Sequence, residues 1–143
     1  MKLVIDANVL IKLYVPEVLS RKADSLFRDA ENRRIDLIAP DLIYPEAGNI
    51  LWKKQRLKEL SRPDVEEITE AILSLPLVVE PVKLLLPLAV DIAIGYNITV
   101  YDAAYVALAT VYKTTLVTGD KKLVDNLSRT ILTKNLQWLG TYK

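Results

Sequence analysis

Short apolar runs alternate along this chain with longer segments of helical spacing. Residues 3–5 are apolar, mostly β-branched and followed by Asp6, a pattern that predicts a buried strand ending at that carboxylate. Residues 36–40 predict a second short strand, closed by Pro40. The same reasoning predicts further strands at residues 77–79, 114–118 and 130–132.

Between these runs, apolar side chains recur every three or four residues, as they do in amphipathic helices. One such helix follows Pro16 and continues to Ala30. Further helices are predicted over residues 41–56, 63–75, 83–96, 103–112 and 121–127. The helix that carries Glu46 begins either near Asp41 or at Pro45, because a proline in the second turn removes a backbone donor, whereas a proline at the first position does not.

Strands separated by helical segments predict parallel β-α-β units. We therefore expect an α/β fold, with a central, mostly parallel β-sheet flanked by helices on both faces. The chain has 143 residues, of which 51% are apolar, and it contains no repeat or low-complexity spacer. This is the size of one ordinary domain, so we expect a single domain that spans residues 1–143.

Composition narrows the chemistry that the chain can perform. It has no cysteine and no histidine, which excludes thiolate nucleophiles, Cys-ligated zinc and the commonest general base. A net charge of +1 is too small to attract a polyanion globally, so nucleic acid would have to meet a local basic patch. The uncharged stretches are too short to span a membrane and the N-terminus lacks secretion features, so we expect a soluble, cytoplasmic protein.

Four acidic residues are placed where they can converge. Asp6 closes the first predicted strand, Asp120 follows residues 114–118, and Asp102 follows residues 98–100 at the start of a helix. Ligands of open parallel sheets bind just beyond the carboxyl ends of the strands. Glu46 lies about one helical turn past the strand that ends at Pro40, and its longer side chain can reach the same edge.

Crowded carboxylates raise one another's pKa, and a bound divalent cation reverses that cost. Oxygen ligands without His or Cys suit Mg²⁺ or Mn²⁺ rather than zinc. Such an ion polarises a phosphoryl oxygen and supplies a hydroxide-like nucleophile. The four acids therefore predict hydrolysis of phosphodiester bonds at a metal site that needs no histidine.

Four segments, VIDANVLIKLY, YPEAGNILWK, TVYDAAYVALA and LVTGDKKL, resemble the motif blocks of the PIN-domain ribonucleases, and particularly the VapC-type toxins of toxin–antitoxin pairs. The resemblance runs from residue 3 to about residue 132. It implies one PIN-like nuclease domain that acts on RNA, forms a homodimer and binds a small antitoxin protein that blocks the active-site groove.

The resemblance also implies roles for individual residues. Asp6 and Asp102 would bind the metal most directly, and Glu46 and Asp120 would complete the acidic site. The auxiliary polar positions of the family, which orient ligands or waters, correspond to Asn8 and Thr118.

Structural roles compete with these assignments. Asp102 and Asp120 each precede a helical run, where Asp is a favoured N-cap, and capping is compatible with metal binding. Asn8 equally fits the cap of a helix beginning at Val9, and Thr118 equally reflects β propensity. Asp125, on the last short helix, is expected to be a surface acid and is kept only as a reserve ligand.

A basic run on the helix of Glu46 has two interpretations. Its charges suit a helix C-terminus, or they contact RNA phosphates beside the site. The RNA-binding candidates are Lys53, Lys54 and Arg56. Asn49 shares the helix face of Glu46, and Trp52 is expected in the core or at a dimer interface rather than stacked on bases.

Other functions remain open at this stage. Haloacid-dehalogenase-like phosphatases also use an Asp after the first strand, but they need a second Asp two residues later, where this chain has Asn8. A two-component receiver needs paired acids that are not evident. A catalytically silent PIN-like interaction module is a further alternative, although such a module is expected to have lost one or more acids, and all four are present.

Overall fold

A five-stranded sheet forms the centre of the protein, described here from a computed structural model that covers residues 1–143. The strand order is β3-β2-β1-β4-β5, and every neighbouring pair is parallel. The strands are β1 (Lys2–Ile5), β2 (Asp36–Pro40), β3 (Val78–Glu80), β4 (Thr115–Thr118) and β5 (Leu136–Trp138).

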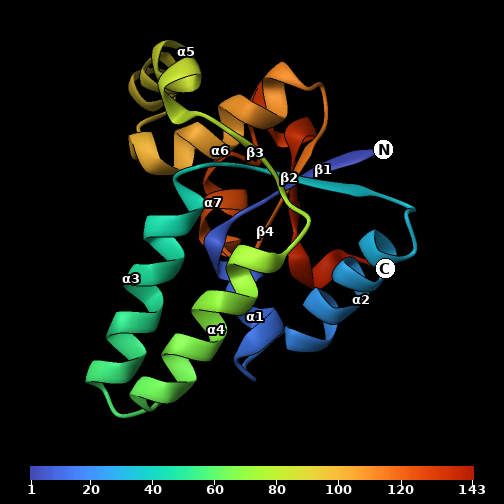
Figure 1. Ribbon diagram of the computed structural model, residues 1–143. Coiled ribbons are helices and arrows are strands. Elements are labelled where there is room, and N and C mark those ends of the chain that lie inside the picture. Colours follow the sequence, from blue (N-terminus) through green and yellow to red (C-terminus); the bar gives the residue numbers. More distant parts are fainter.

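Helices cover both faces of this sheet. Figure 1 shows α5 and α6 on one side of the strands and α1, α3 and α4 on the other. Consecutive strand side chains point to opposite faces, and Leu3, Val4 and Ile5 of β1 are all buried, as two covered faces require. The helices are α1 (Ala7–Tyr14), α2 (Ser20–Glu31), α3 (Ile43–Arg56), α4 (Arg62–Ser74), α5 (Val82–Tyr96), α6 (Val100–Val111) and α7 (Lys121–Asn126), with short 3₁₀ helices η1 (Ile131–Asn135) and η2 (Leu139–Thr141). The predicted α/β fold is confirmed, and the sheet is parallel throughout.

The order of the strands creates one switch point. The chain builds outward from β1 through β2 to β3, and then returns to place β4 on the other side of β1. Ile5 of β1 lies opposite Val117 of β4, so both strands end at the same level. Such a switch point is where ligands of open parallel sheets bind. The residues that follow these two strands are Asp6 and, after Thr118, the turn to Asp120.

Helix α3 begins between the two starting points considered from the sequence. Its first residue is Ile43, so Pro45 is the third helical residue and lies in the first turn. The N–H groups of a first turn have no intrahelical partner, and a proline there costs no hydrogen bond. The backbone N–H of Glu46 donates to the carbonyl of Leu42 at 3.2 Å. Pro45 therefore leaves Glu46 in regular helical geometry.

One prediction about local structure is wrong. Residues 130–132 are not a strand: the Thr130 hydroxyl accepts from the backbone N–H of Leu132 at 3.2 Å and starts η1, and β5 comes later, at Leu136–Trp138. A side chain that bonds to its own backbone here overrides the β propensity of threonine. Trp52 is 53% exposed, so of the two places predicted for it the core is excluded and a dimer interface stays a prediction.

No single helix is long and apolar enough to cross a membrane. Helices α5 and α6 together reach the necessary length and composition, but they are bent by 114° at the break between them.

Candidate active site

Asp6 connects the ends of the two central strands. Its Oδ1 accepts a hydrogen bond from the backbone N–H of Val9 at 2.9 Å and so caps α1, while its Oδ2 accepts from the hydroxyl of Thr118. The residue is only 8% exposed. Burial raises the pKa of Asp6, the hydrogen bonds oppose that effect without cancelling it, and repulsion from Asp120 adds to the increase.

Asp120 lies in the turn that follows β4. Its Oδ1 accepts from the backbone N–H of Leu123 at 3.1 Å, which confirms the predicted N-cap, here of α7. Its own N–H donates to the Thr118 hydroxyl at 3.0 Å. A Cβ on Gly119 would lie 3.3 Å from the Cβ of Asn8, so this turn passes tightly over the start of α1. The close approach brings Asp120 beside Asp6.

Asp102 enters the site from α6 and does not cap that helix, contrary to one interpretation of the sequence. The N-cap is Thr99, whose hydroxyl accepts from the backbone N–H of Asp102 at 3.1 Å. Residues 98–100 are likewise no strand, since α6 already begins at Val100. Because Thr99 is the N-cap, the Asp102 carboxylate is not required for capping. Burial raises the pKa of Asp102, and repulsion from Asp120 raises it further.

Glu46 reaches the same place from α3. Burial raises its pKa, and repulsion from Asp6 and Asp102 adds to the increase although Tyr105 opposes it. The atom Glu46 Oε1 is buried and has no hydrogen-bond partner, and the same is true of Tyr105 Oη. Tyr105 lies on α6, three residues after Asp102, and is 2% exposed. A buried acceptor and a buried donor thus face each other without completing a bond of good geometry.

The four acids form one electrostatic group. Repulsion acts between Asp6 and Asp120, between Asp102 and Asp120, and from Glu46 to both Asp6 and Asp102. These repulsions act between acids at the end of β1, on α3, on α6 and in the turn after β4. No three of the carboxylates lie close enough together to form a complete metal-binding cluster.

Comparison with known proteins decides the family. A model of the PIN domain matches residues 3–127, most of the chain. The chain belongs to the PIN-domain family. Ribonuclease VapC3 of Pyrobaculum aerophilum is 38% identical to it over 130 residues, which cover 87% of this chain and 94% of that relative. The predicted family is confirmed. The chain is therefore assigned to it and not to the phosphatase or receiver families considered from the sequence.

Solved structures share the fold. VapC20 of Mycobacterium tuberculosis, a toxin that cleaves the sarcin-ricin loop, matches with a TM-score of 0.67 at 13% identity, over 86% of this chain and 93% of that one. VapBC2 of Rickettsia felis, bound to a DNA fragment from its promoter, matches with a TM-score of 0.62 at 15% identity, over 96% of this chain and 98% of that one. At these identities the likeness concerns the architecture.

The two residues predicted to be auxiliary, Asn8 and Thr118, occupy different environments. Thr118 is completely buried and bonded to Asp6, so it has a structural partner inside the site. Asn8 is the second residue of α1 and is exposed, and Asp6 rather than Asn8 provides the cap. The capping interpretation of Asn8 is therefore wrong.

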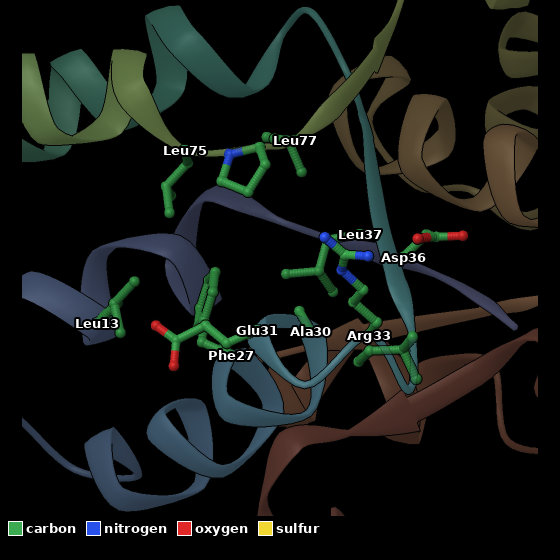
Figure 2. A pocket seen from close by; sticks show the side chains of 11 residues that line it. Leu13, Phe27, Ala30, Glu31, Arg33, Asp36, Leu37, Leu75 and Leu77 are labelled. Carbon is green, nitrogen blue, oxygen red and sulfur yellow. The ribbon is translucent and has the colours of Figure 1, made fainter.

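One cavity of the PIN domain lies away from the acids. It has a volume of about 480 Å³, and Figure 2 shows Leu75 and Leu77 on one side of it and Phe27 and Ala30 on the other. Asp36, the first residue of β2, also lines it, so it lies at the amino ends of the strands. None of the four acids lines this cavity. A second cavity, of about 430 Å³, opens directly beside Glu46.

The basic residues on α3 divide into two kinds. The Lys54 ammonium pairs with Glu17 and with Glu59, at 3.3 Å each. Lys53 is exposed and makes no ion pair, and the guanidinium of Arg56 lies over the Trp52 ring, 4.8 Å from its centre. Only Lys53 and Arg56 carry charges that no acidic side chain compensates.

Tyr105 is the site residue that sequence reasoning missed. Its position three residues after Asp102 places both side chains on one helix face, a signal that was available in the spacing. The signal is weak, since a tyrosine in an Ala-rich helix is equally expected to fill the core.

Proposed function

We propose that this PIN domain, residues 1–143, is a divalent-metal-dependent endoribonuclease and the toxin component of a toxin–antitoxin pair. The observation that carries the proposal is the grouping of Asp6, Glu46, Asp102 and Asp120 near the switch point between β1 and β4, in a chain without His or Cys. The name of the relative Ribonuclease VapC3 supports an RNA substrate.

The acidic site fits a hard divalent ion, Mg²⁺ or Mn²⁺. All its donors are oxygens, the pKa values of three carboxylates are raised by burial and mutual repulsion, and Glu46 Oε1 is a buried acceptor without a partner. Asp6 and Asp102 would hold the ion, with Glu46 and Asp120 completing its surroundings. Mg²⁺ retains several waters and needs only one or two carboxylates, so a full protein cage is not required. When bound, the ion polarises a phosphoryl oxygen and lowers the pKa of water.

The protein's own contribution is to hold these acids in place. Thr118 and the N–H of Val9 fix both oxygens of Asp6, and the N–H of Leu123 fixes one oxygen of Asp120. The N-termini of α1 and α6 point at the site, where their dipoles favour negative charge. This preorganisation keeps the carboxylates together in spite of their repulsion.

RNA would approach along α3. Lys53 and Arg56 extend from the acidic site on this helix and would contact phosphates, whereas the paired Lys54 would contribute less than the sequence alone suggests. A single-stranded segment suits the acidic site, because an unstacked backbone can bend toward the acids.

Two protein partners belong to the proposal: a small antitoxin and a second copy of the chain. The toxin–antitoxin name of VapBC2 supports the first. For the second, α5 leaves Leu84 70% exposed and Ile94 78% exposed, which is apolar surface suited to a homodimer. We place the protein in the cytoplasm, where RNA substrates are found.

RNA cleavage by the purified protein tests the function. We expect Mg²⁺ or Mn²⁺ to support cleavage, EDTA to stop it, and Asp6→Asn and Asp102→Asn to abolish it while keeping the circular dichroism of the wild type. Asp125→Asn is the matched control, because that exposed carboxylate pairs only with Lys121, and it should retain activity. Intact RNA under every metal, with hydrolysis of a phosphomonoester, would identify a phosphatase instead. If neither substrate is hydrolysed, the chain is a silent interaction module.

A further inference from the structure

The cavity beside Glu46 has features that hydrolysis alone does not explain. It is formed by the start of α1, one face of α3 and the start of α6. Glu46 lines it, and Tyr101, which also lines it, immediately precedes Asp102. Its volume of about 430 Å³ is within the range of small-molecule sites, about 300–1,000 Å³. Whatever occupies the cavity is therefore adjacent to the acidic site.

Three polar side chains in this cavity have free hydrogen-bonding groups. Asn8, Asn49 and Tyr101 make no side-chain hydrogen bond to the rest of the protein, although they lie on three different helices. Tyr101 is 63% exposed, so much of its surface is open to a ligand. Each asparagine amide offers both a donor and an acceptor. Leu42 and Ile50 are half-buried and add apolar surface.

This combination matches the chemistry of a nucleobase. Proteins recognise unstacked RNA bases by stacking them on aromatic rings and by hydrogen bonds to their edges. The ring of Tyr101 supplies the stacking surface, and the amides of Asn8 and Asn49 supply paired donors and acceptors. We propose that the cavity is a nucleobase pocket, which holds one unstacked base of the RNA next to the bond that is cut. The inference rests on the proposed function and adds to it the residues that select the substrate.

The pocket gives Asn8 and Asn49 direct roles. Asn8 reads the base edge instead of orienting a ligand of the metal. Asn49, one helical turn past Glu46, faces the same base from α3. A base held in this pocket would lie next to Glu46, which lines the pocket, and therefore beside the acidic site.

Uncharged ribonucleosides test the pocket without any cleavage. Adenosine, guanosine, cytidine and uridine are titrated separately into the metal-free protein, and the side-chain amide resonances of Asn8 and Asn49 are followed by NMR. We expect at least one nucleoside to shift both amides. Tyr101→Ala should weaken its binding at least about fivefold, the lower limit for stacking of one base on an aromatic ring, and Tyr101→Phe should retain most of the affinity.

Gln55→Ala is the matched control, since this exposed amide is on the same helix but does not line the pocket. Its affinity for the nucleoside should equal that of the wild type. The same variants are then assayed on a short single-stranded RNA, where Tyr101→Ala and Asn49→Ala should lower kcat/KM and relax the base preference beside the cut.

The outcomes separate this inference from the proposed function. If RNA is cleaved but no nucleoside shifts either amide, or Tyr101→Ala binds as well as the wild type, the pocket is not for a base and the nuclease proposal stands. If nucleosides bind and RNA is not cleaved, the pocket stands and the nuclease proposal fails. If arginine amide, a mimic of a peptide side chain, shifts the two amides and nucleosides do not, the cavity belongs to a protein partner and the inference is wrong.

Discussion

The hydroxyl of Thr118 donates a hydrogen bond to Oδ2 of Asp6, and this contact joins the ends of β4 and β1 across 112 residues of sequence. Both residues are buried, and the same hydroxyl accepts the backbone N–H of Asp120 at 3.0 Å. Thr118 is therefore the one side chain that touches two of the four acids. Its role is to fix their relative positions at the switch point of the sheet.

Thr118→Val keeps the shape of the side chain and removes the hydroxyl. It leaves Asp6 Oδ2 without its donor and the N–H of Asp120 without its acceptor. Because unsatisfied buried polar groups are costly, we expect a loss of about 1–3 kcal/mol in the free energy of unfolding, measured by urea denaturation. Thr118→Ser keeps the hydroxyl and should lose less. Equal stability of Thr118→Val and the wild type would contradict this role.

Tyr105→Phe, unlike Thr118→Val, should not lower the free energy of unfolding. The Tyr105 hydroxyl is buried and has no partner, so its removal should leave the metal-free protein equally stable or more stable. Tyr112→Phe, near the other end of the same helix, removes a hydroxyl that donates to Glu80 and should cost about 0.5–1.5 kcal/mol. Thermal unfolding of both variants checks the contrast, and a large loss in Tyr105→Phe would mean that its hydroxyl already has a partner.

The raised pKa values predict a pH dependence of stability. Burial raises the pKa of Asp6 above 3.8, so folding favours its neutral form. This contribution is present at low pH and is lost as the pH rises through the raised pKa. In the absence of metal, the Tm of the wild type should therefore fall relative to that of Asp6→Asn as the pH increases from 4.5 to 8. Saturating Mn²⁺ should remove the trend, because a cation favours the ionised form. A wild type that gains stability over Asp6→Asn as the pH rises without metal would contradict the prediction.

The basic residues of α3 should differ in their effect on RNA binding. Lys53→Ala and Arg56→Ala each remove an uncompensated charge, and each should reduce the slope of log affinity against log salt by about 0.7 on single-stranded RNA. Lys54→Ala should leave the slope close to that of the wild type, because Glu17 and Glu59 already pair with this ammonium. Fluorescence anisotropy in EDTA at several salt concentrations measures the slopes. If Lys54→Ala has the largest effect, these ion pairs do not persist in solution.

Strand positions were predictable because a strand that is buried on both faces leaves a continuous apolar run. Residues 3–5 and 36–40 carry that signal, and both are strands in the structure. Asp6 could be placed for the same reason, since a carboxylate that follows such a run must lie at the edge of the sheet. β5 was missed because Leu136–Trp138 is short, half-buried and without an apolar run.

Other features depend on contacts that spacing does not encode. Either Thr99 or Asp102 is a good N-cap, and only the conformation of the chain after α5 selects Thr99. The pairing of Lys54 with Glu17 joins residues 37 positions apart. The basic run in the sequence therefore does not show which of its charges lack an acidic partner. The unpartnered hydroxyl of Tyr105 is likewise a property of how α3 packs near α6.

The central claim is that four acids from four separate elements make up one divalent-metal site, in which Asp6 and Asp102 hold the ion and Glu46 and Asp120 complete its surroundings. Mn²⁺ titration by isothermal calorimetry tests it most directly. Asp6→Asn, Glu46→Gln, Asp102→Asn and Asp120→Asn should each weaken binding at least about tenfold, since even the loss of a partner outside the ligand set has an effect of that size. Asp125→Asn should bind like the wild type. Unchanged affinity in all four variants would contradict the claim.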